Sequence, residues 1–316
     1  MERNLFQKLL HRRESGIFIA LVVLIILISS FQPKFISRDN LFLVSRQIAL
    51  TAIIALGVLF VILTGGIDLS VGSTVGLSGF ICGLGMAAGF HPLLAVVVGL
   101  LTGAAVGAVN GAIVAYVGVT PFIVTLGMLG AAHGVILIIK QGESIRNISE
   151  AFIAFGNGSA FGISVPVLIL IAIAASCFLI LGRTIFGRQV FAIGGNEKAA
   201  ALSGINTRAV KFFTYVLCGV LSAVTGILYV ARFQSAQADS GKGTELDAIA
   251  AAVIGGTSLM GGEGSVVGVL LGATIMGVIR NGLVLLTVSP YWQELIIGTI
   301  IVLAAILDVI RGRKRP

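Results

Sequence analysis

Asp68 is the residue of this sequence whose type and position most need an explanation. It lies in TGGIDLSVGS (64–73), between two strongly apolar stretches. A carboxylate at membrane depth is costly, so it either serves a function of its own or is satisfied locally. Gly65-Gly66 would break one helix, and Asp68 would then cap the next by accepting its free N–H groups, which is the role we favour. Both roles place Asp68 near a polar pathway, because broken helices at membrane depth line cavities.

Three uncharged polar residues, Gln47, Asn110 and Asn281, also lie in apolar stretches. Their amides could hydrogen-bond a hydroxylated solute, which makes them candidates for a translocation pathway together with Asp68. The alternative, which we favour for any single residue, is that each ties one helix to another. Arg280, beside Asn281, is expected to extend its charged group toward a membrane interface.

Several kinds of chemistry have no matching pattern in the sequence. The G-x-x-x-x-G-K-[ST] phosphate loop is missing, and GKGT (241–244) lacks the preceding glycine, so the chain cannot use ATP alone. No Ser/His/Asp or H-E-x-x-H arrangement is present, which argues against an enzyme. Cys82, Cys177 and Cys218 are dispersed in apolar stretches, which argues against disulfides and against a metal site. The sequence predicts no cofactor and no metal.

The elements that must position these residues are transmembrane helices. Hydrophobic residues make up 57% of the 316, charged residues 11%, and the mean hydropathy is +1.08. The apolar stretches predict about ten spans, at residues 16–32, 44–63, 70–89, 93–117, 120–140, 164–182, 212–232, 246–260, 265–286 and 292–310. The eighth and ninth stretches are the weakest, because the uncharged run 248–262 has only 15 residues, and a half-span or re-entrant element is an alternative there. We therefore predict one all-α transmembrane domain over 1–316, with discontinuous helices near the Gly-Gly motifs.

The basic residues predict the orientation. The net charge is +8, and 13 of the 21 Lys and Arg residues fall in residues 1–13, 183–211 and 311–316. Such clusters flank spans on the cytoplasmic side, so both termini and residues 183–211 are predicted to be cytoplasmic. A nucleic-acid surface would place basic and aromatic residues together on a folded face, and this pattern does not.

Residues 183–211 form a 29-residue polar segment inside an apolar chain. Its centre, GGNEKAAALSGI (194–205), predicts a short amphipathic helix with glycine on both sides. Gly204 can end that helix, because glycine adopts the left-handed conformation at little cost. A small exposed helix in a basic loop predicts contact with a partner.

Small residues recur every fourth position along one predicted span. Such rows let helix backbones approach closely in a bilayer, where packing drives association. The row comprises Ala95, Gly99, Gly103, Gly107, Gly111 and Ala115, and a shorter one comprises Gly264, Gly268 and Gly272. Both rows predict a tightly packed bundle and say little about a substrate.

Four motifs occur in the order found in one family. They are ILTGGIDLSVGS (62–73), FGRQVFAIGGNEKAAALSGI (186–205), ELDAIAAAVIGGTSLMGGEGSVVG (245–268) and NGLVLLTVSPYWQ (281–293). With them the chain resembles the membrane subunits of ABC importers for monosaccharides, from about residue 16 to residue 310. The resemblance implies a bacterial inner or plasma membrane permease that alternates its access between the two sides.

The resemblance also implies partners. These are an ABC ATPase pair that binds the ATP, a second permease chain, an external sugar-binding protein and the membrane lipid. By the same resemblance, Glu197, Ala200, Ser203 and Gly204 occupy the docking helix and its exit turn and couple the permease to the ATPase. Neither the sugar nor the choice between homodimer and heterodimer can be predicted.

The alternative from composition is a ten-helix secondary transporter of the drug/metabolite type. Such a transporter would need no ATPase and would usually show two similar halves with short internal loops. The 29-residue polar segment and the lack of convincing similarity between the halves count against it.

Overall fold

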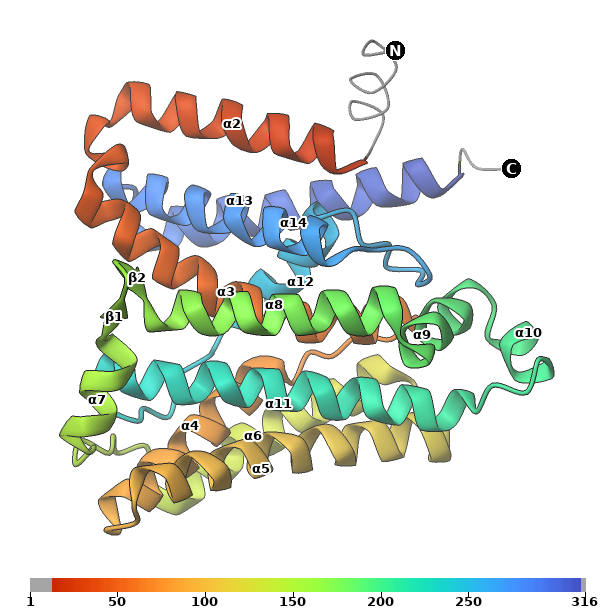
Figure 1. Cartoon of the computed structure of the whole chain (residues 1–316), viewed down its shortest axis with the longest axis horizontal. Coiled ribbons are helices and arrows are strands. Elements are labelled where there is room, and N and C mark those ends of the chain that lie inside the picture. The colour runs from red at the N-terminus through yellow and green to blue at the C-terminus, as the bar shows by residue number, and fades with distance from the viewer. Residues whose placement is uncertain (1–12, 314–316) are drawn as a thin grey trace.

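The computed structural model describes residues 13–313, which are almost entirely helical (Figure 1). The long helices are α2 (Arg13–Phe31), α3 (Arg38–Leu63), α5 (Pro92–Ala112, prolonged by the π-helical turn Ile113–Val117), α6 (Pro121–Lys140), α8 (Val165–Arg183), α11 (Thr207–Phe233), α13 (Val266–Leu285) and α14 (Pro290–Arg313). The shorter elements are the 3₁₀ turn Pro33–Ile36, α4 (Val71–Ala87), α7 (Glu150–Asn157), the hairpin strands β1 (Ser159–Ala160) and β2 (Ile163–Ser164), α9 (Ile185–Gly195), α10 (Glu197–Leu202) and α12 (Thr244–Ile254). The predicted all-α, polytopic fold is confirmed.

Seven of the described helices are long and apolar enough to cross a membrane, and α4 and the first part of α14 are shorter apolar helices. The span predicted at 246–260 is wrong as a full crossing. The helix there, α12, has 11 residues, about 16 Å at 1.5 Å per residue, roughly half the hydrocarbon thickness. α12 is therefore the half-span that the sequence analysis gave as the alternative. Turns at Gly255 and Gly256 follow it.

Two helices form the centre of the bundle. Nearly every side chain of α3 from Ala49 to Leu63 is buried, and α11 packs against α3, α4 and α5. The outer helices instead expose large apolar side chains, such as Phe18 and Ile26 of α2. This reversal of the soluble pattern suits a chain whose solvent is lipid.

From Gly103 to Gly111, the first row of small residues lies at the contact between α5 and α11. An added Cβ on Gly111 would lie 2.8 Å from the carbonyl oxygen of Phe212, and one on Gly107 would lie 2.9 Å from the carbonyl carbon of Tyr215. Gly103 similarly faces Gly219 of α11. The two backbones touch along the row, which leaves no room for a side chain.

Two short helices are each preceded by a non-helical segment. Residues 64–70 lead into α4, and residues 234–243 lead into α12. The second segment crosses the first half of α4, because an added Cβ on Gly76 would lie 2.6 Å from the carbonyl oxygen of Ser240. Backbone outside helices is therefore enclosed by protein, as a membrane interior requires.

The two ends of the bundle differ. In Figure 1, α7 and the β1–β2 hairpin lie at the left end, and α9 and α10 project at the right end. The start of α2 and the end of α14 both point toward the right end. The segment predicted to contact a partner is thus at the opposite end from the only hairpin of the described residues.

Candidate functional site

Asp68 and Asn110 belong to one buried polar cluster. The Asp68 carboxylate accepts hydrogen bonds from the Ser70 backbone N–H (2.9 Å) and hydroxyl (2.6 Å). The Asn110 amide donates to the same hydroxyl at 2.8 Å. Asp68 is 2% exposed and Asn110 is fully buried. The chain of bonds joins the break between α3 and α4 to α5, so Asp68 binds the start of α4 through its N-cap residue, Ser70.

The cluster has unused hydrogen-bonding capacity. Among the described residues, the Asn110 side-chain oxygen and the Tyr215 hydroxyl are buried and without a partner. The Tyr215 hydroxyl faces the break, since an added Cβ on Gly66 would lie 2.6 Å from it. Unsatisfied buried polar atoms are rare in native proteins. This cluster is therefore a place where hydrogen bonds can rearrange.

The four pathway candidates do not form a single site. Asn281 of α13 exchanges two 2.9 Å hydrogen bonds with Asn40 of α3, amide to amide. Gln47 is half-buried on α3, and within the described chain no hydrogen bond links it to the other three. The geometry of Asn110 and Asn281 is the helix-to-helix bonding expected as the alternative role.

The sequence analysis missed a part-buried ion pair between two helices. Arg280 of α13 donates to the Asp247 carboxylate of α12 at 2.7 Å. Asp247 is mostly buried, whereas the Arg280 side chain is 33% exposed, so its extension toward a membrane interface stays a prediction. A lone acid and a lone base in two neighbouring apolar stretches were the available signal, because ionic groups within a membrane generally pair.

Asp68 provides a prediction that separates the two roles of its carboxylate. Asp68→Asn keeps an oxygen that can accept both Ser70 bonds, whereas Asp68→Leu leaves the Ser70 N–H buried and unsatisfied, a cost of about 1–3 kcal/mol. We expect the Asn variant to keep most of the folded yield and the Leu variant to lose much of it, measured by gel filtration in detergent. Equal loss of transport by both, with folding intact, would show that the charge itself is used.

The helix predicted to contact a partner, α10, is capped at both ends by residues of its own segment. The Asn196 side chain accepts from the Ala199 N–H at 3.0 Å and caps the start of α10. At the other end, Gly204 adopts φ +83°, and the N–H of Ile205 donates to the Ala200 carbonyl at 3.2 Å. This is the Schellman closure that the glycine predicts. α10 is thus preformed without a partner.

The α10 residues placed by resemblance among the coupling residues differ in their exposure. Ala200, placed by resemblance among the coupling residues, is only 5% exposed and packs against the bundle core. Leu202, which the sequence analysis did not single out, is 91% exposed. Glu197 is held by Lys211 at 2.6 Å, and Ser203 is exposed. A partner would meet Leu202 and its neighbours, while Ala200 anchors the helix.

A basic cavity lies at the opposite end of the bundle. It has a volume of about 410 Å³ and is lined by three arginines, Arg38, Arg46 and Arg232, with Asp39 as its one acidic residue. Arg46 is held by Asn157 of α7 at 2.7 Å. Guanidinium groups with free N–H donors bind carboxylate or phosphate oxygens. The cavity can therefore receive an acidic group from outside the chain.

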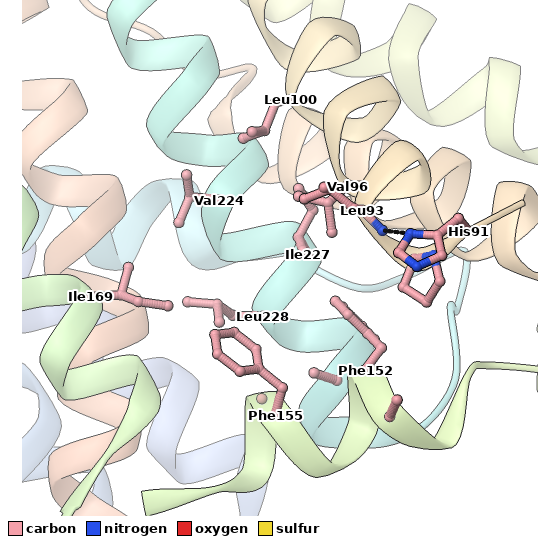
Figure 2. A pocket seen from close by; sticks show the side chains of 14 residues that line it. His91, Leu93, Val96, Leu100, Phe152, Phe155, Ile169, Val224, Ile227 and Leu228 are labelled. Atoms are coloured by element: carbon pink, nitrogen blue, oxygen red, sulfur yellow. Dashed lines mark hydrogen bonds between the residues drawn. The ribbon is translucent and has the colours of Figure 1, made fainter. Parts of the chain in front are cut away.

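A second cavity, of about 460 Å³, is almost entirely apolar (Figure 2). Its walls come from α5, α7, α8 and α11 and include Phe152, Phe155 and Leu228. His91 is the polar exception, and its ring nitrogen accepts from the Leu93 N–H at 3.3 Å as the cap of α5. A sugar needs several hydrogen-bonding groups, so this cavity is suited to acyl chains and not to a sugar.

Residues 40–305 match the family model described as the branched-chain amino acid transport system permease component. The chain belongs to this permease family. It is 44% identical to the ribose import permease of Escherichia coli K12 and 41% identical to that of Bacillus subtilis 168, over about nine-tenths of each chain. The D-allose transport permease of E. coli K12 is 36% identical. No solved structure matches the chain.

These relatives confirm the resemblance to monosaccharide importer permeases, and they set the secondary-transporter alternative aside. The permease is a multi-pass protein of a bacterial membrane. It is the transport component and not itself an enzyme, and it carries no cofactor of its own.

Proposed function

We propose that this permease imports ribose or a closely related aldose. The observation that supports ribose is the 44% identity over 93% of this chain and of the E. coli ribose permease. The relatives named for D-allose and L-arabinose are less similar, at 36% and 35%. The higher identity to the ribose permeases, over 93% of this chain, favours that substrate.

The working assembly in this proposal holds two permease chains, two ATPase subunits and an external sugar-binding protein. The ATPase would dock at α10, whose exposed Leu202 offers an apolar contact. The binding protein would dock at the opposite end, where the Arg38–Arg46–Arg232 cavity can take its carboxylates. Lipid acyl chains would fill the apolar cavity.

The proposed topology has ten crossings with both termini and residues 183–211 in the cytoplasm. The clustering of 13 basic residues supports this side assignment. In this arrangement α4 and α12 each cross together with the non-helical segment before it, residues 64–70 or 234–243. The whole of 1–316 then forms one transmembrane domain.

In the proposed mechanism the sugar passes between the two permease chains as they open alternately to each side. The hydrogen bonds among Asp68, Ser70 and Asn110 would hold the α3–α4 break beside this pathway. The Asn110 side-chain oxygen, which accepts no hydrogen bond in this state, would allow those bonds to rearrange. Asn281 would hold α13 to α3, and Gln47, half-buried, could face the pathway. ATP binding by the partner would drive the switch through α10.

The decisive experiment is reconstitution with the cognate ATPase and binding protein. We expect the ATPase to co-purify with the permease and labelled ribose uptake into vesicles to require ATP and the binding protein. Leu202→Cys should react with an impermeant maleimide only from the cytoplasmic side, against little background, because Cys82, Cys177 and Cys218 are buried. Uptake without an ATPase would contradict the proposed function, and labelling from outside would overturn the topology.

A further inference from the structure

Three loops meet in backbone contact beside the docking segment. They are the end of α3 at Leu63, the end of α9 at Gly194 and the turn at Gly261-Gly262 between α12 and α13. The Gly262 N–H donates to the Leu63 carbonyl at 3.0 Å. An added Cβ on Gly194 would overlap both of these groups and would lie 2.8 Å from the Gly262 Cα. We call Leu63, Gly65, Gly194, Gly261 and Gly262 the glycine junction.

Within the glycine junction, the positions of Gly194, Gly261 and Gly262 leave no room for a side chain. An added Cβ on Gly261 would lie 3.0 Å from the Gly65 nitrogen and 3.1 Å from the Gly194 Cα. Gly65, Gly261 and Gly262 have φ values of +78°, +90° and +75°, a region that other residues adopt only with strain. The backbones of the three loops are therefore in direct contact, with no flexible side chain between them.

Each loop of the glycine junction is connected to a different segment: the α3–α4 break, α12 or α10. From Leu63 the chain continues through the break that carries Asp68. The turn at Gly261 follows α12, whose Asp247 pairs with Arg280. From Gly194 it reaches, within three residues, the start of α10 at Glu197. The junction is thus the place where the segment leading to α10 touches both the α3–α4 break and the turn that follows α12.

We propose that the glycine junction transmits the position of α10 to the α3–α4 break and to α12 at once. The proposal rests on the function proposed above, since it takes α10 as the ATPase docking helix. Backbone segments in direct contact move together, because no flexible side chain lies between them. A conformational switch needs one two-state element whose equilibrium is shifted by both the ATPase docking site and the transport pathway. Gly194 acts here as a positioning residue that touches neither ATP nor sugar.

Neighbouring glycines provide a matched test. Gly194→Ala places a methyl group into the junction, whereas an added Cβ on Gly195 meets no heavy atom within 4 Å. In reconstituted vesicles we expect Gly194→Ala to lower ATP-driven ribose uptake by about tenfold and Gly195→Ala to leave it near the wild-type rate. The ATPase should co-purify with both variants, because α10 stays exposed.

A reporter beside the junction separates transmission from a merely structural role. Met260 is 82% exposed, so Met260→Cys can be labelled with maleimide. We expect its labelling rate to differ between the nucleotide-free and vanadate-trapped assemblies, and Gly194→Ala to abolish that difference. If Gly194→Ala does not fold, the reporter in the otherwise wild-type chain decides, and equal rates in both states overturn the proposal.

The failures of the two proposals are distinguishable. If α10 is not the docking helix, Leu202→Asp will leave ATPase co-purification with the permease unchanged. If only the junction proposal is wrong, the ATPase will dock through α10 as proposed, and Gly194→Ala will transport as well as Gly195→Ala.

Discussion

Replacing Gly107 with leucine should remove most of the folded permease from the membrane. An added Cβ at this position would lie 2.9 Å from the Tyr215 carbonyl carbon and 3.0 Å from the Val216 Cα, so α5 and α11 would have to separate. Overpacking costs about 1–3 kcal/mol where side chains can adjust, and more where the obstacle is backbone. The folded yield after detergent extraction and gel filtration measures the effect.

Gly16→Leu is the matched control for this substitution. An added Cβ on Gly16 meets nothing within 4 Å, and its helix, α2, lies at the edge of the bundle. Leucine should be tolerated there because it adds apolar surface in contact with lipid. If Gly107→Leu gives as much folded, transporting protein as Gly16→Leu, then the α5–α11 contact does not depend on the row of small residues.

The parts of the fold that the sequence predicted are those with a local signal. The four-residue spacing from Gly99 to Gly111 marks a helix face by itself, and the structure buries that face against α4 and α11. The Gly65-Gly66 pair likewise predicts the end of α3, because Gly65 needs a positive φ. The basic residues around 183–211 mark a polar loop without any knowledge of the bundle.

The parts that it could not predict depend on distant partners. Asn281 pairs with Asn40, 241 positions away, and no pattern of one sequence brings these two amides together. Arg280 and Asp247 are 33 positions apart, in stretches whose helix length hydropathy could not define. An 11-residue helix followed by glycine turns has nearly the composition of a span, because both are buried in apolar surroundings.

The sequence could not assign the faces of α10, for a related reason. Six residues, Glu197–Leu202, make fewer than two turns, so an apolar stripe cannot be read from EKAAAL. The structure decides that Ala200 turns inward and Leu202 outward. At 91% exposure, Leu202 is the apolar side chain that α10 would present to the ATPase in the proposed assembly.

Leu202→Asp should therefore release the ATPase from a permease that remains folded. A large apolar side chain at the tip of a docking helix is the kind of anchor whose loss costs about 2–4 kcal/mol of binding free energy, or roughly thirtyfold to a thousandfold in affinity. Folding should not change, because the side chain contacts little of its own chain. We expect co-purification of the ATPase and ATP-driven ribose uptake to be lost together, with the gel-filtration profile of the permease unaltered.

Two further substitutions test whether the apolar character of Leu202 matters. Leu202→Met keeps the apolar volume and should keep the ATPase bound, since leucine and methionine usually exchange at a cost below about 1.5 kcal/mol. Lys198→Asp places the same acidic group on an exposed position of α10 and should weaken association less than Leu202→Asp. If both aspartate variants weaken association equally, the contact is electrostatic and Leu202 is not its anchor. If neither does, the ATPase docks elsewhere on the cytoplasmic face.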